Sequence, residues 1–273
     1  MQIGILAESV VTLNSKARSN GIKASSSKLA DNVSSKKKHK EKNSTARFYP
    51  IISYSITLLL VFLFIYSQFN FMHMGCAAYD TLSMAQMPVY CRLSVANSTI
   101  YLSLLFPSIV FSYLLARKKS LKAIIEGLGL SASKLTFNNI GIGVLLFASI
   151  LLLSFAMSIF SALSNIPLPT NVQSLLGGMP LYLLIFSFII APIDEEILFR
   201  GFLVPRIGIV LSALVFALLH FSYLSISETF AAFVFGLLAG YVFKKTGSLY
   251  ATIIGHMLVN LLTIIAILAL SGV

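Results

Sequence analysis

Seven long apolar stretches, each close to the length of a membrane-spanning helix, restrict the folds that this chain can adopt more than any other feature does. They run roughly over 49–71, 99–116, 139–163, 178–202, 206–222, 227–243 and 248–271. About 20 apolar residues in a helix cross the ~30 Å hydrocarbon core of a bilayer. Hydrophobic residues make up 57% of the chain and charged residues only 11%, whereas soluble domains carry roughly 25% charged residues. The sequence therefore predicts an all-α, polytopic membrane helical bundle with about seven transmembrane helices.

The composition changes along the chain and divides it into two parts. Residues 1–47 are rich in Ser, Lys and Asn and poor in aromatic residues, which is typical of disordered segments. We interpret residues 1–47 as a disordered basic cytoplasmic tail and residues 48–273 as the membrane domain. Between the second and third stretches, residues 117–139 have an amphipathic pattern and are expected to run along the membrane interface.

The net charge of +11 does not indicate nucleic-acid binding, because of where the charges lie. Ten of the twenty Lys and Arg residues precede residue 48, and the others lie between the apolar stretches or near their ends. Lys and Arg are concentrated in the cytoplasmic loops of membrane proteins. With a cytoplasmic N-terminus, seven spans place nineteen of the twenty on the cytoplasmic side and only Arg92 outside. We therefore expect the C-terminus outside, the lipid bilayer as a partner and no nucleic acid.

The two cysteines of the chain, Cys76 and Cys91, precede the second apolar stretch and are expected in the first loop. They could form one disulfide bond if this loop faces an oxidising space. Their spacing matches no metal-binding motif, so we expect no metal site there.

The last four apolar stretches differ from the others because they contain ionisable and amide side chains. A carboxylate at the centre of a membrane helix costs roughly 2.5–3.5 kcal/mol on insertion scales. Such groups therefore face a bundle interior or a wet cavity, and they mark functional sites. The polar set comprises Asp194, Glu195, Glu196, Arg200, His220, Glu228, His256 and Asn260.

Helical spacing sorts these side chains into groups. Glu196 and Arg200 are four residues apart, so they share a helix face and are expected to form an ion pair. Glu195 is rotated by about 100° from Glu196 and lacks this partner, which favours Glu195 for acid–base chemistry. Asp194 is expected near the entrance of the cavity.

The turns between the predicted helices place the other members of this polar set at a similar depth in the bilayer. The turn between the fourth and fifth stretches should lie near Pro205. Counted from the turns at 1.5 Å per residue, Glu195, His220, His256 and Asn260 could then meet in one layer of the bilayer interior. His256 and Asn260 are four apart and share a helix face, and Phe216 stands one turn from His220 as a cavity wall. The turns that connect these helices near the polar residues lie on the cytoplasmic side. We therefore expect the cavity to open to the cytoplasm.

A carboxylate, two imidazoles and an amide in one dry cavity suit hydrolysis. Glu195 with His220 could hold and deprotonate a water molecule, and His256 with Asn260 could donate hydrogen bonds to an oxyanion. A zinc site formed by Glu195, His220 and His256 is the competing interpretation, because three N/O ligands and a water form a common catalytic zinc site. The spacing alone does not separate these two mechanisms.

Three short motifs resemble those of one known family of membrane proteases. They are Glu-Glu-x-x-x-Arg at 195–200, Phe-x-x-x-His at 216–220 and His-x-x-x-Asn at 256–260. Each motif is weak alone, but all three in order on successive apolar stretches resemble the CAAX-protease and bacteriocin-processing (CPBP, or Abi) family. The resemblance covers about residues 178–270, so a protease-like core is expected at 178–271.

The resemblance implies an intramembrane endopeptidase similar to type II CAAX prenyl endopeptidases and their prokaryotic relatives. It implies that Glu195 and His220 activate water, that His256 and Asn260 stabilise the oxyanion, and that Glu196, Arg200 and Phe216 support them. The family was long described as metalloproteases, and its structurally understood member as using a glutamate without a metal. We therefore favour no cofactor, with zinc as the alternative. The expected substrate is a peptide or protein at the membrane, with prenylated CAAX proteins as one class.

Two other functions stay open at this point. In a transporter or channel, the acids and histidines would relay protons or bind a cation, but polar groups would then line a pathway, usually with an internal repeat. We see no repeat, and the polar groups cluster in the last four stretches. A non-catalytic membrane scaffold related to proteases is the second alternative, and only an activity measurement separates it from an enzyme.

Overall fold

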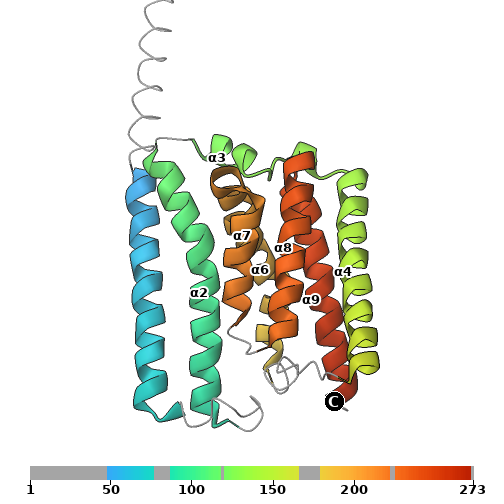
Figure 1. Ribbon diagram of the computed structural model, residues 1–273. Coiled ribbons are helices and arrows are strands. Elements are labelled where there is room, and N and C mark those ends of the chain that lie inside the picture. Colours follow the sequence, from blue (N-terminus) through green and yellow to red (C-terminus); the bar gives the residue numbers. More distant parts are fainter. Residues whose placement is uncertain (1–47, 77–86, 118–119, 166–178, 222–224, 272–273) are drawn as a thin grey trace, which may run out of the picture. The chain divides into compact units, whose positions relative to one another are not determined.

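The computed structural model of the protein describes residues 48–76, 87–117, 120–165, 179–221 and 225–271. The chain divides into two compact units, residues 1–51 and residues 52–273. The predicted tail, residues 1–47, lies outside the described residues. The second unit contains all the elements that position the polar residues (Figure 1).

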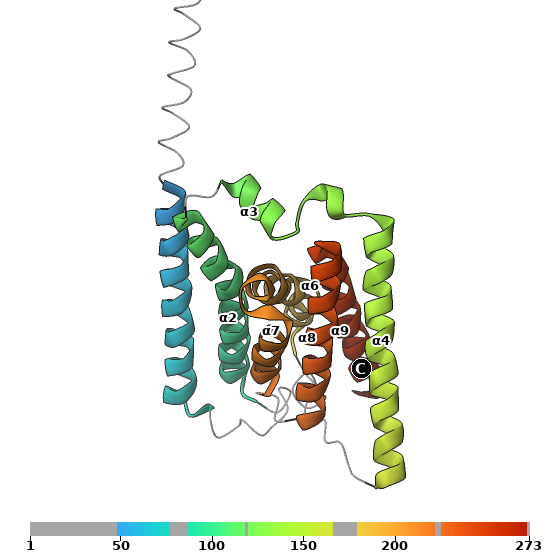
Figure 2. The ribbon, with the colours of Figure 1, turned by 45° about the horizontal axis from the view of Figure 1, so that its top comes forward.

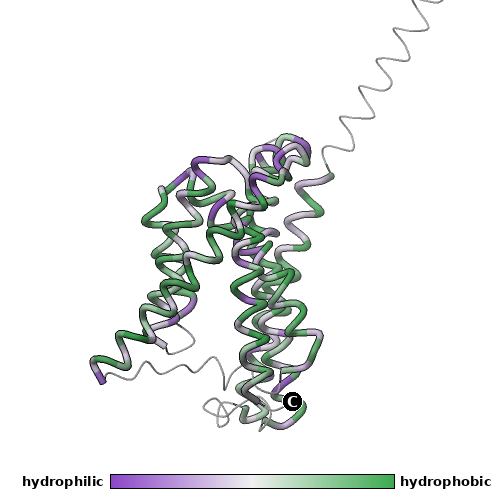
Figure 3. Tube along the Cα trace, turned by 90° about the vertical axis from the view of Figure 1, so that its right-hand side faces the viewer, coloured by the Kyte–Doolittle hydropathy of each residue, from purple (hydrophilic) through white to green (hydrophobic). Residues whose placement is uncertain are grey.

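Every regular element among the described residues is helical (Figure 1). Within them, six helices are long and apolar enough to cross a bilayer by length and composition, and apolar residues dominate along them (Figure 3). Their bounds are Phe48–His73, Val89–Ala116 (α2), Phe137–Ser164 (α4), Leu181–His220, Ile226–Thr246 (α8) and Leu249–Ser271 (α9). The protein is therefore an integral, multi-pass membrane protein.

A break at Gly208 divides the longest of these helices into two. Leu181–His220 comprises α6 (Leu181–Glu196), a π-helix (Ile197–Leu203, η4) and α7 (Val204–His220). Inside α7, Gly208 has φ 83° and ψ 171°, a conformation that glycine adopts readily. The chain reverses there, so that the rest of α7 packs along η4. About seven helices result, as predicted from the sequence.

The turn between the fourth and fifth apolar stretches and the first residue of α2 both differ from the sequence-based expectation. The reversal lies at Gly208 instead of near Pro205, because proline is tolerated in the first turn of a helix and α7 begins at Val204. Similarly, α2 begins at Val89 instead of near residue 99. Cys91 therefore lies in the first turn of α2 and not in a loop, and it forms a disulfide bond with Cys76.

Glycine and alanine bring the helices of the core close together. The contacting pairs are α7 with α8, α4 with α9, α6 with α9 and α2 with α6 (Figure 2). A Cβ at Gly236 of α8 would lie 2.8 Å from the Cβ of Ala213 in α7. A Cβ at Gly143 of α4 would lie 2.7 Å from the Ala251 carbonyl oxygen in α9. Such small residues let helix backbones approach in membranes, where packing replaces the hydrophobic effect as the driving force.

A segment that we call the strap, residues 121–134, crosses one end of this core (Figure 2). It contains α3 (Leu121–Gly127), which Ser120 caps by accepting from the Ala123 N–H, and the short helix Ala132–Lys134. Hydrogen bonds connect the strap to the α8–α9 turn. They include Leu249 N–H to the Gly129 carbonyl at 3.1 Å, Lys134 Nζ to the Thr246 carbonyl at 3.2 Å, the Ser248 hydroxyl to the Lys134 carbonyl at 3.2 Å, and the Tyr250 hydroxyl to the Leu130 carbonyl at 2.9 Å. This is part of the segment that was expected to run along the membrane interface.

Hydroxyl groups join the first helix to α2. The Ser67 and Ser98 hydroxyls lie 2.8 Å apart, and the Ser94 hydroxyl donates to the Ser67 carbonyl at 3.0 Å. Hydrogen bonds of this kind hold helices together within a bilayer. Together with the disulfide bond they fix the first helix, from residue 52 onward, against α2.

Gly129 provides a test of the strap. Its φ is +78°, and an added Cβ would lie 2.7 Å from the Gly247 carbonyl oxygen. We expect Gly129→Ala to destabilise the protein by at least about 1–2 kcal/mol, because a left-handed conformation alone costs that much for alanine. Thermal unfolding of the purified protein in detergent measures this effect. Gly127→Ala is the matched control, because nothing lies within 4 Å of its added Cβ. Equal melting temperatures for the two variants would contradict the close contact.

Candidate functional site

The π-helix η4 sets the positions of the acidic residues and Arg200. Glu195 and Glu196 end α6, and Arg200 lies within η4. A π-helix disturbs the regular backbone hydrogen bonds, and π-helical turns are frequent at functional sites. In membranes, side-chain hydroxyls often bond the carbonyls that such turns release. Here the Ser212 hydroxyl of α7 donates to the Phe199 carbonyl at 2.7 Å, which connects α7 to η4.

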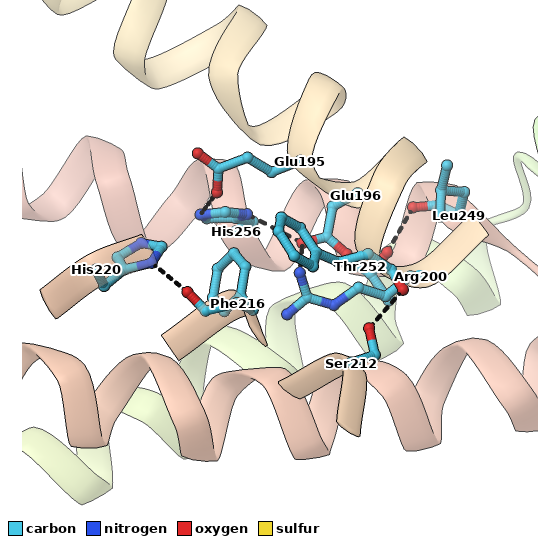
Figure 4. A network of polar contacts seen from close by, with 10 residues as sticks. Glu195, Glu196, Arg200, Ser212, Phe216, His220, Leu249, Thr252 and His256 are labelled. Atoms are coloured by element: carbon cyan, nitrogen blue, oxygen red, sulfur yellow. Dashed lines mark hydrogen bonds and ion pairs between the residues drawn. The ribbon is translucent and has the colours of Figure 1, made fainter. Parts of the chain in front are cut away.

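Glu196 is the centre of a buried network of charged and polar groups (Figure 4). Its Oε1 lies 2.8 Å from Arg200 Nη1, so the ion pair predicted from the i, i+4 spacing is confirmed. The same oxygen lies 3.0 Å from His256 Nδ1 in α9. Because an ionised carboxylate only accepts hydrogen bonds, Nδ1 carries the proton in this contact. Glu196, Arg200 and His256 are all buried.

Aromatic rings surround the Arg200 guanidinium. Its central carbon lies 4.3 Å from the ring centroid of Phe216 and 5.0 Å from that of Phe235. A cation over a ring face is attracted by the ring quadrupole, more strongly when water is excluded. Phe216 was predicted to wall a cavity, and in the structure it also contacts the ring of His220, with centroids 4.5 Å apart.

Glu195 differs from Glu196 in its surroundings. Its Oε2 lies 3.8 Å from His256 Nε2, and 21% of its side chain is exposed, compared with 0% for Glu196. Among the described residues, Glu195 Oε2 has no hydrogen-bond partner. The structure therefore brings this carboxylate beside an imidazole without the strong ion pair that holds Glu196.

His220 lies at the end of α7, beside Phe216 and on the same side of the network as Glu195 (Figure 4). Its Nδ1 lies 2.9 Å from the Phe216 carbonyl oxygen. A carbonyl only accepts, so Nδ1 carries the proton and Nε2 carries the lone pair in the neutral ring. This hydrogen bond sets both the orientation and the tautomer of His220.

Asn260 lies one turn beyond His256 on α9 and contacts a different helix. Its Nδ2 donates to the Ser187 carbonyl of α6 at 2.9 Å. One amide hydrogen of Asn260 is thus used to join α9 to α6. The predicted role of Asn260 at an oxyanion stays a prediction.

Asp194 is a polar residue whose surroundings the sequence did not indicate. It was expected near an entrance, but only 5% of it is exposed, and it accepts a hydrogen bond from the Ser103 hydroxyl at 2.9 Å. Ser103 belongs to α2, 91 residues away in the chain. A lone serine in an apolar stretch gave no signal of this contact.

The side-chain geometry bears on the competing zinc interpretation. Within the described residues, no group of three or more His, Cys, Asp or Glu side chains is arranged to hold a metal ion. His256 directs Nδ1 to Glu196, and His220 directs Nδ1 to a carbonyl. Because a metal-ligating imidazole commonly donates its other ring N–H to a carboxylate or a carbonyl, these two contacts fit both mechanisms, and the zinc alternative stays a prediction.

The buried ion pair can be tested by breaking it and by replacing it. Arg200→Met leaves Glu196 buried without its cation, and we expect a loss of about 3–5 kcal/mol in the free energy of unfolding. The double variant Glu196→Gln/Arg200→Met removes both charges and should be more stable than Arg200→Met alone. Denaturant unfolding in detergent measures both. Arg206→Met, at an exposed arginine, is the control. A double variant less stable than the single one would contradict the pairing.

Comparisons with known proteins support the resemblance in the C-terminal part. Residues 177–262 match the family model described as "Type II CAAX prenyl endopeptidase Rce1-like". The uncharacterized protein YpbD of Bacillus subtilis (strain 168) is 35% identical over 82 residues, which cover 28% of this chain and 41% of YpbD. The chain thus spans about two fifths of the length of this curated relative. No solved structure matches the chain.

The matched region includes all three motifs, from Glu195 to Asn260. The resemblance that the motifs indicated is therefore confirmed over this region. Residues 177–262, less than half of the chain, are therefore similar to the Rce1-like domain of type II CAAX prenyl endopeptidases.

Proposed function

We propose that the protein is an intramembrane endopeptidase that hydrolyses peptide bonds of membrane-associated substrates. The observation that carries this proposal is the position of Glu195, whose side chain is 21% exposed and whose buried Oε2 has no hydrogen-bond partner among the described residues. Beside it stand two imidazoles whose Nδ1 atoms are occupied by fixed acceptors. Such an arrangement brings together a carboxylate and two imidazoles that can act on a water molecule and a substrate carbonyl.

In the proposed reaction, Glu195 and His220 hold the attacking water. His220 Nε2, which carries the lone pair, or the Glu195 carboxylate takes a proton as the water oxygen bonds to the substrate carbonyl carbon. The C–N bond of the tetrahedral intermediate then breaks, and the same proton passes to the leaving amine. The products are a carboxylic acid and an amine, which become a carboxylate and an ammonium group when the acid proton passes to the amine, and no covalent intermediate forms on the protein.

His256 is proposed to stabilise the oxyanion. Its Nδ1 donates to Glu196 at 3.0 Å, so in the imidazolium form its Nε2–H is the remaining donor. The carboxylates of Glu196 and Glu195 lie 3.0 Å from Nδ1 and 3.8 Å from Nε2 of this ring. Donors fixed before the reaction stabilise a developing negative charge most effectively. Asn260 is proposed as a second donor through the amide hydrogen that does not bond Ser187.

The proposed substrate is a peptide or protein held at the bilayer, with prenylated CAAX proteins as the first class to test. The family match supports the reaction class, and the lipid-embedded position of the network supports a membrane-bound substrate. We also propose that the N-terminus is cytoplasmic and the C-terminus outside, because this arrangement places nineteen of the twenty Lys and Arg residues in the cytoplasm.

Cleavage of a farnesylated CAAX peptide by the purified protein tests the proposal. We expect Glu195→Gln and His220→Asn each to lower the turnover about 10²–10⁴-fold, because general acid–base groups contribute that much. Glu126→Gln is the control, since Glu126 is exposed in the strap and pairs with Lys122. Unchanged turnover in Glu195→Gln would refute the assigned role, and no cleavage by any form would favour the scaffold alternative.

Removing metal ions separates the two hydrolytic mechanisms. The glutamate mechanism predicts that a strong chelator leaves peptide cleavage unchanged, because no step uses a metal ion. Zinc-dependent hydrolysis predicts loss of activity with the chelator and recovery with added zinc. Metal analysis of the active preparation provides the control, since tightly bound zinc would appear there at one ion per chain.

A further inference from the structure

Three consecutive acidic residues end α6, and they contact different neighbours. Successive residues of a helix are rotated by about 100°, so Asp194, Glu195 and Glu196 do not share a helix face. Asp194 accepts a hydrogen bond from the Ser103 hydroxyl of α2 at 2.9 Å, whereas Glu196 contacts Arg200 and α9. Glu195 therefore lies between two residues that are attached to two different helices.

Glu195 itself has no comparable attachment. Its Oε2 lies 3.8 Å from His256 Nε2, which is longer than a hydrogen bond, and this oxygen has no hydrogen-bond partner among the described residues. The placement of the carboxylate thus depends on the backbone that carries it. That backbone leads directly into η4, where the regular helical hydrogen bonds change.

The hydroxyl of Ser103 is used differently from that of Thr99, one turn earlier in α2. A serine or threonine within a helix can donate to the carbonyl four residues before it, and Thr99 donates in this way to the Val95 carbonyl at 3.0 Å. Ser103 donates instead to Asp194. Both partners are buried, with 6% of Ser103 and 5% of Asp194 exposed. The hydroxyl of Ser103 therefore forms a buried contact between two helices.

The same face of α2 follows the chain from α6 into η4. The ring of Phe106 meets that of Phe199 edge-on, with centroids 6.0 Å apart, and the ring of Tyr113 meets that of Phe202 at 5.4 Å. Phe106 and Tyr113 lie three and ten residues after Ser103, spacings that keep all three on one side of a helix. Contacts of α2 thus accompany the chain on both sides of the junction at which Glu195 lies.

Loss of the Ser103 hydroxyl would leave the Asp194 carboxylate without this donor. A buried polar group without a hydrogen bond is costly, so the carboxylate would turn toward other polar groups or water and displace the end of α6. A displacement of about 1 Å can lower the rate of an enzyme about 10²-fold. The contact therefore lies where a small structural change affects Glu195 strongly.

We infer that Ser103, acting through Asp194, is a positioning residue for Glu195. Asp194 is held from α2 and Glu196 from α9, so the backbone of Glu195 is fixed on both sides and its carboxylate is kept beside His256. Through this contact, a helix outside the matched region 177–262 contributes to the reaction without touching the substrate. The inference rests on the proposed endopeptidase function.

Cleavage kinetics of a farnesylated CAAX peptide test this role. Ser103→Ala removes the donor, and we expect kcat to fall about 10–100-fold with KM unchanged, because Ser103 does not touch the substrate. Ser103→Thr keeps a hydroxyl and should recover most of kcat. Asp194→Leu should resemble Ser103→Ala, whereas Asp194→Asn keeps an acceptor oxygen and should retain more activity than Asp194→Leu. Thr99→Val is the matched control, because its hydroxyl bonds within its own helix.

Thermal unfolding of the same variants in detergent follows the contact without cleavage. Ser103→Ala and Asp194→Leu remove the same hydrogen bond, so their effects on the melting temperature should not add in the double variant. Additive effects would overturn the contact.

An unchanged kcat in Ser103→Ala, a change in KM alone, or an equal loss of kcat in Thr99→Val would overturn the positioning role while the proposed function stands. Absence of cleavage by the unaltered protein would overturn the proposed function and with it this role, whereas the melting temperatures would still report the contact. The two failures are therefore distinguishable.

Discussion

The shared carboxylate of Glu196 is the interaction on which the rest of the network depends. One oxygen contacts both Arg200 on the next helical turn and His256 on α9. Burying a charge without a partner in a low-dielectric interior is costly, so each of the three groups requires the others. By joining η4 to α9 in this way, Glu196 also sets the orientation of His256, whose second nitrogen faces Glu195.

The surrounding structure supports this contact from several directions. Ser212 joins α7 to η4 through the Phe199 carbonyl, and Ser103 joins α2 to α6 through Asp194. The strap closes one end of the core over η4 and the α8–α9 turn. Ser103 and the strap lie outside the matched region 177–262, whereas Ser212 and Phe199 lie inside it. The region similar to the Rce1-like model is therefore held by α2 and the strap as well as by its own helices.

The sequence predicted what helical periodicity determines, and it missed what depends on contacts between distant segments. About seven apolar helices and the Glu196–Arg200 pair follow from local spacing, and both are present, since the described residues form six long apolar helices of which the longest is broken at Gly208. By contrast, the contact of His256 with Glu196 joins residues 60 apart, and that of Ser103 with Asp194 joins residues 91 apart. Spacing shows which residues share a helix face but not which neighbour that face meets. The turn at Gly208 was missed for a related reason, because proline near a helix start resembles a chain reversal in sequence.

Binding of a farnesylated CAAX peptide to purified Glu195→Gln protein, followed by recovery of the peptide, tests the central claim most directly. Gln keeps the shape of the side chain and removes its capacity to take a proton from water. The proposed mechanism predicts that the variant binds the peptide as the unaltered protein does and returns it intact. Recovery of cleaved peptide from the variant, at the rate of the unaltered protein, would contradict the role of Glu195.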